Sequence, residues 1–272
     1  VEKWLATLCC LPADDSSMTA IAEGRKDHSP RLEKCQLFHI DKDLLCSWNQ
    51  NSESFLQHIM NILFHAHYRN QPDDLQILLD SPNHHLFVLT SDDYRPATPE
   101  NIMCVIQVVE EGGLRPDDAV HDLFSGVKPS GHMMPYTMLQ NYNIPALVEF
   151  RGLRIIRIAV HADFQRCGYG SQALSLLLNS IRNFRRDHTR PHDVPNSLLS
   201  RCENAVIVDK LDYVGAMFGV TQDLFNFWSK HCFHPIYLRQ VPSQMTGDHS
   251  ILMLRPIERW DKNKSKDSEG FS

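Results

Sequence analysis

Short apolar runs, separated by polar segments rich in turn-forming residues, follow one another along most of this chain. Their lengths fit β-strands and fall far short of the apolar stretch that crosses a bilayer, so we expect no membrane association. On this pattern we predict strands over residues 37–40, 86–89, 102–109, 154–160, 204–208, 235–238 and 250–254. The polar, proline-containing link 91–100 suits a hairpin between the second and third strands.

Other segments carry apolar residues at helical spacing. Phe55, Ile59 and Ile62 recur in this way and predict a helix over about residues 52–68. Further helices are predicted after Pro72, from about Tyr169 to Phe184, and from Thr221. This order of elements predicts an α/β domain built on a mixed, mostly antiparallel sheet flanked by helices.

We expect three regions along the chain. Residues 1–34 read as a linker or the end of a preceding region, 35–258 as the main domain, and 259–272 as a flexible polar tail. Inside the domain, the glycines and prolines of 112–150 predict a long loop or lid rather than core. The first residue is valine, so we expect an internal fragment of a longer protein.

Composition narrows the class of protein. Apolar residues make up 42% and charged residues 22%, which is typical of a globular domain. The eight cysteines are scattered without a CxxC pair, so we expect reduced thiols and no metal site. The net charge of −6 argues against a polycationic nucleic-acid binder, so any affinity for RNA must come from a local patch.

The segment with the clearest chemistry follows the predicted strand 154–160. That strand runs into the sequence QRCGYGS at 165–171, which opens a predicted helix. Glycines let a backbone approach a ligand closely, and the N–H groups at a helix N-terminus bind phosphate oxygens. The segment therefore predicts a cradle for an anion, although a glycine-containing turn without function is the alternative.

The glycine spacing decides between classes of cofactor. A dinucleotide site requires GxGxxG with an acidic residue about 20 positions later, and a P-loop ends in Gly-Lys-Ser/Thr; neither pattern is present. A strand followed by Q-R-x-G-x-G resembles the GCN5-related N-acetyltransferase (GNAT) superfamily. The resemblance implies acetyl-CoA as cofactor and a GNAT fold with splayed central strands, where the pantetheine arm lies beside the strand and the loop amides hold the diphosphate.

A second set of motifs resembles one family within that superfamily, the RNA cytidine acetyltransferases, and its eukaryotic members in particular. The motifs are AHYRN at 66–70, PDDLQ at 72–76, HHLF at 84–87, RIAVH at 157–161, GYGS at 168–171, LDYVG at 211–215, FW at 227–228, YLRQ at 237–240 and TGDHS at 246–250. The resemblance implies acetyl-CoA contacts at Ile158, Ala159, Val160, Gln165, Arg166, Cys167, Gly168, Tyr169, Gly170, Ser171, Asp223 and Lys230.

This sequence departs from its relatives at some of those positions. They carry glutamate or arginine where Asp223 and Lys230 stand, and glycine where Cys232 stands. Lysine offers charge to a phosphate but lacks the planar fork of arginine, which puts cofactor affinity in doubt rather than fold. Relatives also carry an upstream helicase-like domain that uses ATP, and no Walker loop occurs in this chain.

The resemblance implies acetyl transfer to N4 of cytidine in RNA by direct attack. The exocyclic amine of cytosine is a weak nucleophile, so the reaction needs positioning and a proton acceptor. His67 matches a histidine that the family is thought to use, and it is our candidate catalytic residue. The alternative is that His67 only ends its helix favourably. His161 is placed to orient the loop, and Tyr169 is open between ligand contact and packing.

Basic residues stand at the end of the helix that the glycine loop opens and just after it. They are Arg182, Arg185, Arg186 and Arg190. A solvated loop is the plain interpretation; in an RNA-modifying enzyme the same run, and Lys128, become candidate phosphate contacts.

The resemblance further implies rRNA (18S) and/or tRNA as substrate, a possible adaptor protein or guide RNA as partner, and a location in the nucleus and nucleolus. Two other functions stay open. One is a protein or amine N-acetyltransferase of the same fold. The other is an inactive acetyl-CoA-binding module in ribosome assembly.

Overall fold

The computed structural model describes residues 30–47, 49–66, 73–91, 101–126, 131–184, 198–202, 211–243 and 247–257. Within these ranges the chain forms an eight-stranded sheet in the order β5-β1-β2-β3-β4-β6-β8-β7. The strands are β1 (Cys35–Ile40), β2 (His84–Ser91), β3 (Ile102–Gly112), β4 (Arg151–Val160), β5 (Leu199–Arg201), β6 (Tyr213–Gly219), β7 (His234–Leu238) and β8 (Ser250–Pro256). Among these strands β4 and β6 pair in parallel and the other neighbours pair antiparallel, which confirms the expected mixed sheet.

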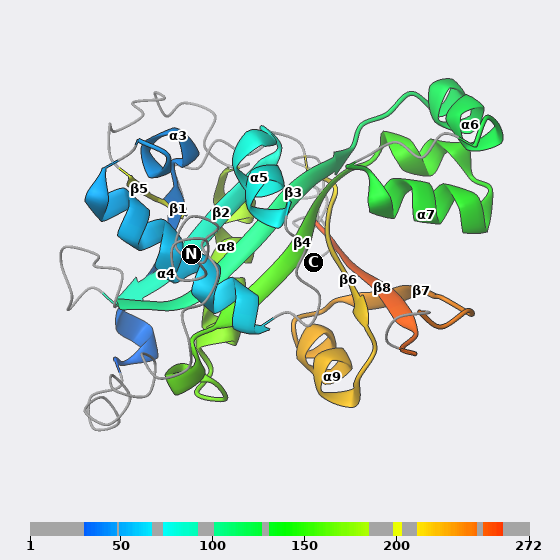
Figure 1. Ribbon diagram of the computed structural model, residues 1–272. Helices are drawn as coiled ribbons and strands as arrows, with labels where there is room; N and C mark the ends of the chain where they lie inside the picture. The colour runs from blue at the N-terminus through cyan, green and yellow to red at the C-terminus, as the bar shows by residue number, and fades with distance from the viewer. Residues whose placement is uncertain are drawn as a thin grey trace, which may run out of the picture.

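Helices cover both faces of the sheet. The described helices are α3 (Lys42–Leu45), α4 (Gln50–Ala66), α5 (Asp74–Asp80), α6 (Pro116–Phe124), α7 (Met133–Tyr142), α8 (Tyr169–Phe184) and α9 (Gln222–Lys230), with 3-10 turns η1 (Leu32–Lys34), η3 (Pro145–Glu149) and η4 (Ala162–Phe164). In Figure 1, α4 and α5 lie in front of the central strands and α8 lies behind them. No described helix is both long and apolar enough to cross a bilayer.

The central strands are apolar on both faces because helices bury both. On β2, Phe87 and Leu89 pack with the cluster that includes α8, whereas Leu86 and Val88 pack with the cluster that includes α4. All four side chains are fully buried. A strand covered on both sides reads as a continuous apolar run rather than an alternating one, which is why the runs in the sequence predicted these strands.

The predicted helix over about 52–68 is α4, with a slightly earlier start. Its cap is Asn49, whose side-chain oxygen accepts from the N–H of Asn51 at 3.2 Å. Phe55, Ile59 and Ile62 are buried, as their spacing predicted. The predictions of a short helix after Pro72, a helix at 169–184 and a helix from Thr221 are confirmed as α5, α8 and α9.

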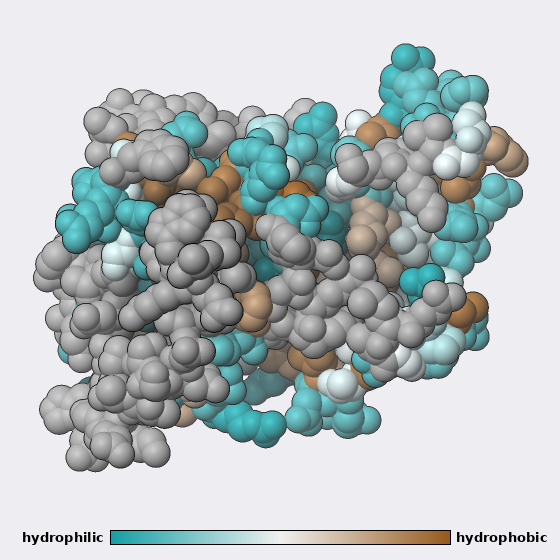
Figure 2. All heavy atoms as spheres, viewed as in Figure 1, coloured by the Kyte–Doolittle hydropathy of each residue, from teal (hydrophilic) through white to brown (hydrophobic). Residues whose placement is uncertain are grey.

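The segment 112–150 differs from the expected loop or lid. It folds into α6, α7 and η3, and buried residues of this unit include Ala119, Met134 and Leu139. Figure 2 shows a mainly hydrophilic outer surface over α6 at the upper right, with hydrophobic side chains where α6 and α7 meet. Pro116 and Pro145 stand at the starts of α6 and η3, where proline is favoured, and Pro135 lies in the first turn of α7, so these prolines do not mark a loop.

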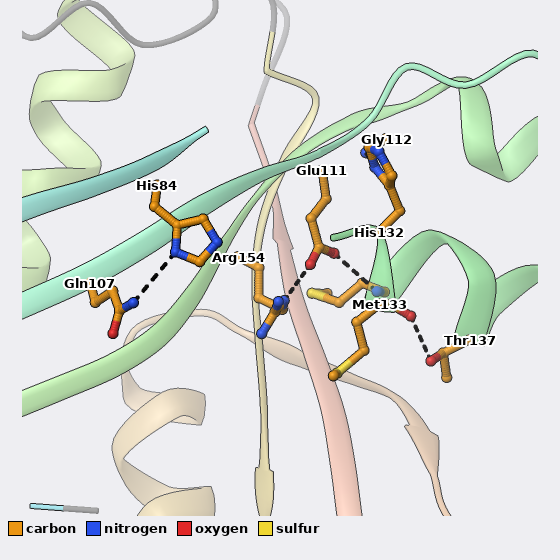
Figure 3. Close-up of polar contacts among 9 residues, drawn as sticks. His84, Gln107, Glu111, Gly112, His132, Met133, Thr137 and Arg154 are labelled. Carbon is orange, nitrogen blue, oxygen red and sulfur yellow. Dashed lines mark hydrogen bonds and ion pairs between the residues drawn. The ribbon is translucent and has the colours of Figure 1, made fainter. Parts of the chain in front are cut away.

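A buried ion pair ties this helical unit to the sheet. Glu111 on β3 accepts a hydrogen bond from Nε of Arg154 on β4, and its other oxygen accepts from the N–H of Met134 at 3.0 Å (Figure 3). The side chains of Glu111 and Arg154 are 1% and 14% exposed. The carboxylate therefore holds the first turn of α7 against the sheet, where a negative charge is favourable.

Replacing Glu111 with alanine is expected to lower the free energy of unfolding by about 3 kcal/mol, because it leaves Arg154 partly buried without its partner. Urea denaturation measures this change. The matched control is Asp118→Asn, which breaks the exposed pair of Arg115 and Asp118 and should cost less than about 1 kcal/mol. Equal losses in both variants would contradict a structural role for Glu111.

For two strands the sequence pattern and the structure cannot be matched directly. The predicted strand 204–208 lies outside the described residues. The strand that pairs in parallel with β4 is β6, which the pattern did not predict because glycines interrupt its apolar residues. The division into a linker, a domain and a tail stays a prediction, since most of residues 1–34 and all of 259–272 are not described.

Candidate functional site

The strands β4 and β6 start side by side and then separate. They pair in parallel from Gly152 with Tyr213 to Ile155 with Ala216, whereas β4 continues to Val160 and β6 to Gly219. Figure 1 shows the two strands diverging toward their C-terminal ends. The splayed central strands expected from the sequence are therefore present, and in open α/β sheets ligands bind at such carboxyl ends.

A β-bulge accompanies the separation. Opposite β3, Arg157 faces Gln107 and Ile155 faces Val108, so Ile156 is the extra residue on β4. A bulge bends its strand and increases the local twist. It stands directly after the last residue of β4 that pairs with β6, which accounts for the divergence of β4 from β6.

The register shows which main-chain groups of β4 face the separation. The N–H of His161 donates to the carbonyl oxygen of Met103 on β3 at 2.9 Å, and Ala159 is the next residue of β4 that points the same way. The N–H and C=O groups of Ile158 and Val160 therefore point away from β3. β6 offers them no partner, because its pairing with β4 ends at Ile155.

This result refines the predicted contacts. Ile158 and Val160 can pair with an extended ligand as a neighbouring strand would, whereas the main chain of Ala159 is directed toward β3 and its side chain is 1% exposed. The amide of the Gln165 side chain already donates to the carbonyl of Val160 at 3.3 Å. This hydrogen bond holds the turn that follows β4 against the C-terminal end of the strand.

The loop after β4 is shaped by local contacts. His161 begins η4 and its Nδ1 accepts from the N–H of Asp163 at 3.4 Å. Its ring also stacks on that of His58 from α4, with centroids 5.9 Å apart. His161 is buried, and these contacts agree with the expectation that it orients the loop.

The two glycines of the loop do different things. Gly168 has φ +92°, a conformation that L side chains rarely adopt, so it allows the turn into α8. At Gly170 a Cβ atom would lie 3.2 Å from Cγ2 of Val160, so this glycine lets α8 approach the end of β4. The first helical bond of α8 runs from the N–H of Gln172 to Gly168, which leaves the earlier amides without intrahelical acceptors. Such amides at a helix N-terminus suit a phosphate group.

Across the separation, α9 presents its own N-terminus. Thr221 caps this helix by accepting from the N–H of Leu224 at 3.3 Å. Asp223 in the first turn lies 3.5 Å from Nη2 of Arg166, and both side chains are largely exposed. This ion pair places the first turn of α9 beside the glycine loop, whereas contact of Asp223 with acetyl-CoA stays a prediction.

Other predicted residues lie farther from this point or face away from it. Lys230 is the last residue of α9, about 10 Å along the axis from Asp223 at the helical rise. The side chain of Tyr169 is buried at 2% exposure, and its hydroxyl donates to the carbonyl of Pro30 at 2.6 Å. The side chain of Tyr169 is therefore a packing group. Cys167 is exposed, with its Sγ donating to the carbonyl of Gln165 at 3.4 Å.

Several candidate residues cannot be placed. His67, Lys128, Arg185, Arg186 and Arg190 lie outside the described residues. The backbone of Arg182 belongs to α8, but its side chain is outside the description. Their proposed roles stay predictions.

A group of polar side chains on the α5-facing side of the sheet was not predicted from the sequence. Gln107 is 5% exposed, and its Nε2 lies 3.4 Å from Nδ1 of His84 (Figure 3). Arg157 on β4 is paired with Asp74 of α5. A usable signal was present, since a glutamine or arginine inside an otherwise apolar strand is a buried polar group that needs a partner.

Two histidines, one on β1 and one on β2, are held in the neutral form. Burial lowers the pKa of His84 to about 4, with the positive charges of Arg154 and Lys42 as further causes. Burial also lowers the pKa of His39 to about 4, followed by the effect of His85. Neutral His84 can therefore accept a hydrogen bond from Gln107 near pH 7.

The lowered pKa of His39 predicts acid sensitivity. Between pH 6.5 and 4 the unfolded chain binds a proton at His39 that the folded protein does not, so stability falls as pH falls through this window. The contribution of His39 is on the order of 3 kcal/mol at most. Urea denaturation from pH 7 to 4 should show a smaller loss for His39→Gln than for the unsubstituted protein. Parallel pH curves for the two proteins would rule out this contribution.

Several known proteins are similar to this chain in sequence. The sequence matches the family described as GNAT acetyltransferase 2 over residues 58–187 and 178–258. A Mus musculus protein named RNA cytidine acetyltransferase is 36% identical, with 96% of this chain and 27% of that protein covered. Proteins of the same name from Dictyostelium discoideum and Achlya ambisexualis are each 32% identical; 97% and 95% of this chain, and 28% and 76% of those proteins, are covered. The chain thus spans little more than a quarter of the mouse and Dictyostelium relatives.

Proposed function

The chain belongs to the GNAT acetyltransferase 2 family, and from this membership we propose that it transfers an acetyl group from acetyl-CoA to N4 of cytidine in RNA. The observation that carries the proposal is the separation of β4 from β6 beside the glycine loop. It combines an unpaired strand edge with a helix N-terminus, which are the two features that an extended, diphosphate-containing cofactor requires.

The residues present fit acetyl-CoA. Ile158 and Val160 would pair with the amide groups of its pantetheine arm, and the amides from Gly168 to Ser171 would bind its diphosphate. When bound, acetyl-CoA supplies an acetyl group on a thioester, which an amine can attack directly. Arg166 belongs to the same loop, and its exposed guanidinium, paired with Asp223, would add positive charge near the diphosphate.

The protein's own groups must position the acceptor and remove a proton. As N4 of cytosine forms its bond to the acetyl carbon, the bond from that carbon to sulfur breaks and N4 loses one proton. His67 follows α4 in the chain and is our proposed acceptor for that proton, since an imidazole is basic enough near neutral pH.

The choice of RNA as substrate rests on the relatives' shared name. The proposal includes rRNA and/or tRNA as the acceptor, an adaptor protein or guide RNA as partner, and action in the nucleus and nucleolus. The basic residues at 182–190 would contact RNA phosphates.

The test uses the natural full-length protein, because the chain covers 27% of the mouse relative. It is incubated with labelled acetyl-CoA and either RNA or histones, and the RNA is then digested to nucleosides. Label in N4-acetylcytidine is expected. Label only in protein would favour a protein acetyltransferase, and binding of acetyl-CoA without any transfer would favour an inactive assembly module.

A further inference from the structure

A row of polar side chains crosses the α5-facing side of the sheet where β4 and β6 separate. His84 on β2, Gln107 on β3 and Arg157 on β4 form the row, and Asp74 at the start of α5 ends it. Gln107 and Arg157 face each other in the register. One step before them on the same face, Val105 faces Ala159, and both belong to the apolar cluster under α4. The row therefore begins where that apolar cluster ends.

Arg157 has a donor without an acceptor. Its side chain is 9% exposed, and its Nη2 donates to the carboxylate of Asp74. Its Nε is fully buried and, within the described part of the chain, has no hydrogen-bond partner. An unsatisfied buried N–H of a charged group is costly, and native proteins rarely keep one without a reason. The ion pair with Asp74 fixes the position of the guanidinium through Nη2 but gives Nε–H no acceptor.

The position of Arg157 connects it to the proposed transfer site. It follows the bulge at Ile156 and directly precedes Ile158, the first residue of β4 whose main chain faces the separation. A ligand paired with Ile158 would thus lie one residue along the strand from the guanidinium. The neighbouring groups leave Arg157 as the cationic donor of the row, because burial lowers the pKa of His84 and Gln107 carries no charge.

We propose that Nε–H of Arg157 binds the acceptor base by donating to a ring carbonyl oxygen, which on the proposed function is O2 of cytosine. Cytosine presents O2 and the reacting N4 amine on the same edge of its ring, so a donor bound to O2 fixes the direction of N4. Arg157 then holds the base by O2 and aims N4 toward the acetyl group.

The first test substitutes Arg157 with lysine in the full-length protein. Lysine keeps the charge next to Asp74 but lacks the planar set of donors, so kcat/KM for the RNA should fall about 10- to 100-fold. The affinity for acetyl-CoA, measured by calorimetry, should be unchanged. The matched control is Arg154→Lys, three positions earlier on the same strand, because Nε of Arg154 is already satisfied by Glu111. This control should change kcat/KM less than about 3-fold.

A second measurement separates binding of the base from a structural role. Synthetic RNA carrying 2-thiocytidine at the target position presents sulfur, a weaker acceptor, in place of O2. The unsubstituted protein should prefer cytidine over 2-thiocytidine about 10-fold, and Arg157→Lys should lose most of that preference. If the lysine variant is unstable, Arg157→Gln combined with Asp74→Asn replaces the ion pair by an amide pair and is tested in the same way.

The possible results separate the role of Arg157 from the proposed function. An unchanged preference in a folded Arg157 variant, or full activity with cytidine RNA, would overturn the role of Arg157 while leaving the proposed function intact. Absence of N4-acetylcytidine with the unsubstituted protein would overturn the proposed function, and this assignment of O2 with it.

Discussion

Substituting valine for Gly168 is expected to weaken the binding of coenzyme A about 100-fold. Gly168 has φ +92°, and a Cβ atom there would lie 3.3 Å from Cδ1 of Leu32. A β-branched residue is strained at this φ, so the loop must change its path into α8. The amides that precede the first helical bond would then no longer converge on the diphosphate. Isothermal titration with coenzyme A measures the loss.

The matched control for this substitution is Gly126→Val. Gly126 also has a positive φ, +71°, but no atom lies within 4 Å of the added Cβ, and the residue stands at the end of α6 away from the loop. Both variants carry similar backbone strain, so both should lose stability. Coenzyme A affinity should change less than about 2-fold in the control. Equal losses of affinity would show that general destabilisation, and not the loop, explains the effect.

Replacing His67 with glutamine is expected to reduce kcat for RNA acetylation by about 100- to 1,000-fold while coenzyme A still binds. Glutamine keeps the size and polarity of the side chain but cannot accept the proton that N4 loses. The rate in the unsubstituted protein should rise with pH as the imidazole loses its proton, and the variant should lack this rise. Single-turnover kinetics at several pH values measures both effects.

The control for His67 is His65→Gln, two positions earlier and exposed in the last turn of α4. Its rate should stay within about 2-fold of the unsubstituted protein. A His67 variant with normal kcat would remove His67 from the reaction. The remaining explanation for His67 would be that it only ends its helix favourably.

The sequence predicted those elements whose signals are local. The apolar runs at 86–89 and 102–109 became β2 and β3 because their residues are buried on both faces. β6 was not predicted because Gly215 and Gly219 weaken its apolar pattern. Its conformation is decided by its pairing with β4 and β8. The helical unit at 112–150 was not predicted because Pro116, Pro135 and Pro145 stand at helix starts or in a first turn, a position that the count of prolines alone does not reveal.

The same distinction holds for the site. The glycine loop was predictable because strand, turn and helix are contiguous, and Gly168 has the positive φ that such a turn requires. The separation of β4 from β6 depends on a bulge at Ile156 and on pairing with residues about 60 positions away in the chain. The ion pair of Arg157 with Asp74 likewise joins residues far apart in sequence. Spacing alone could not reveal these contacts.

The central claim is that the unpaired edge of β4 and the loop after it bind coenzyme A. Amide hydrogen exchange, followed by NMR with and without coenzyme A, tests it residue by residue. We predict slower exchange at Ile158, Val160 and Gly168 when the ligand is bound, and little change at Ala159, whose N–H already faces β3. Coenzyme A binding that leaves the exchange of Ile158 and Val160 unchanged would contradict the claim.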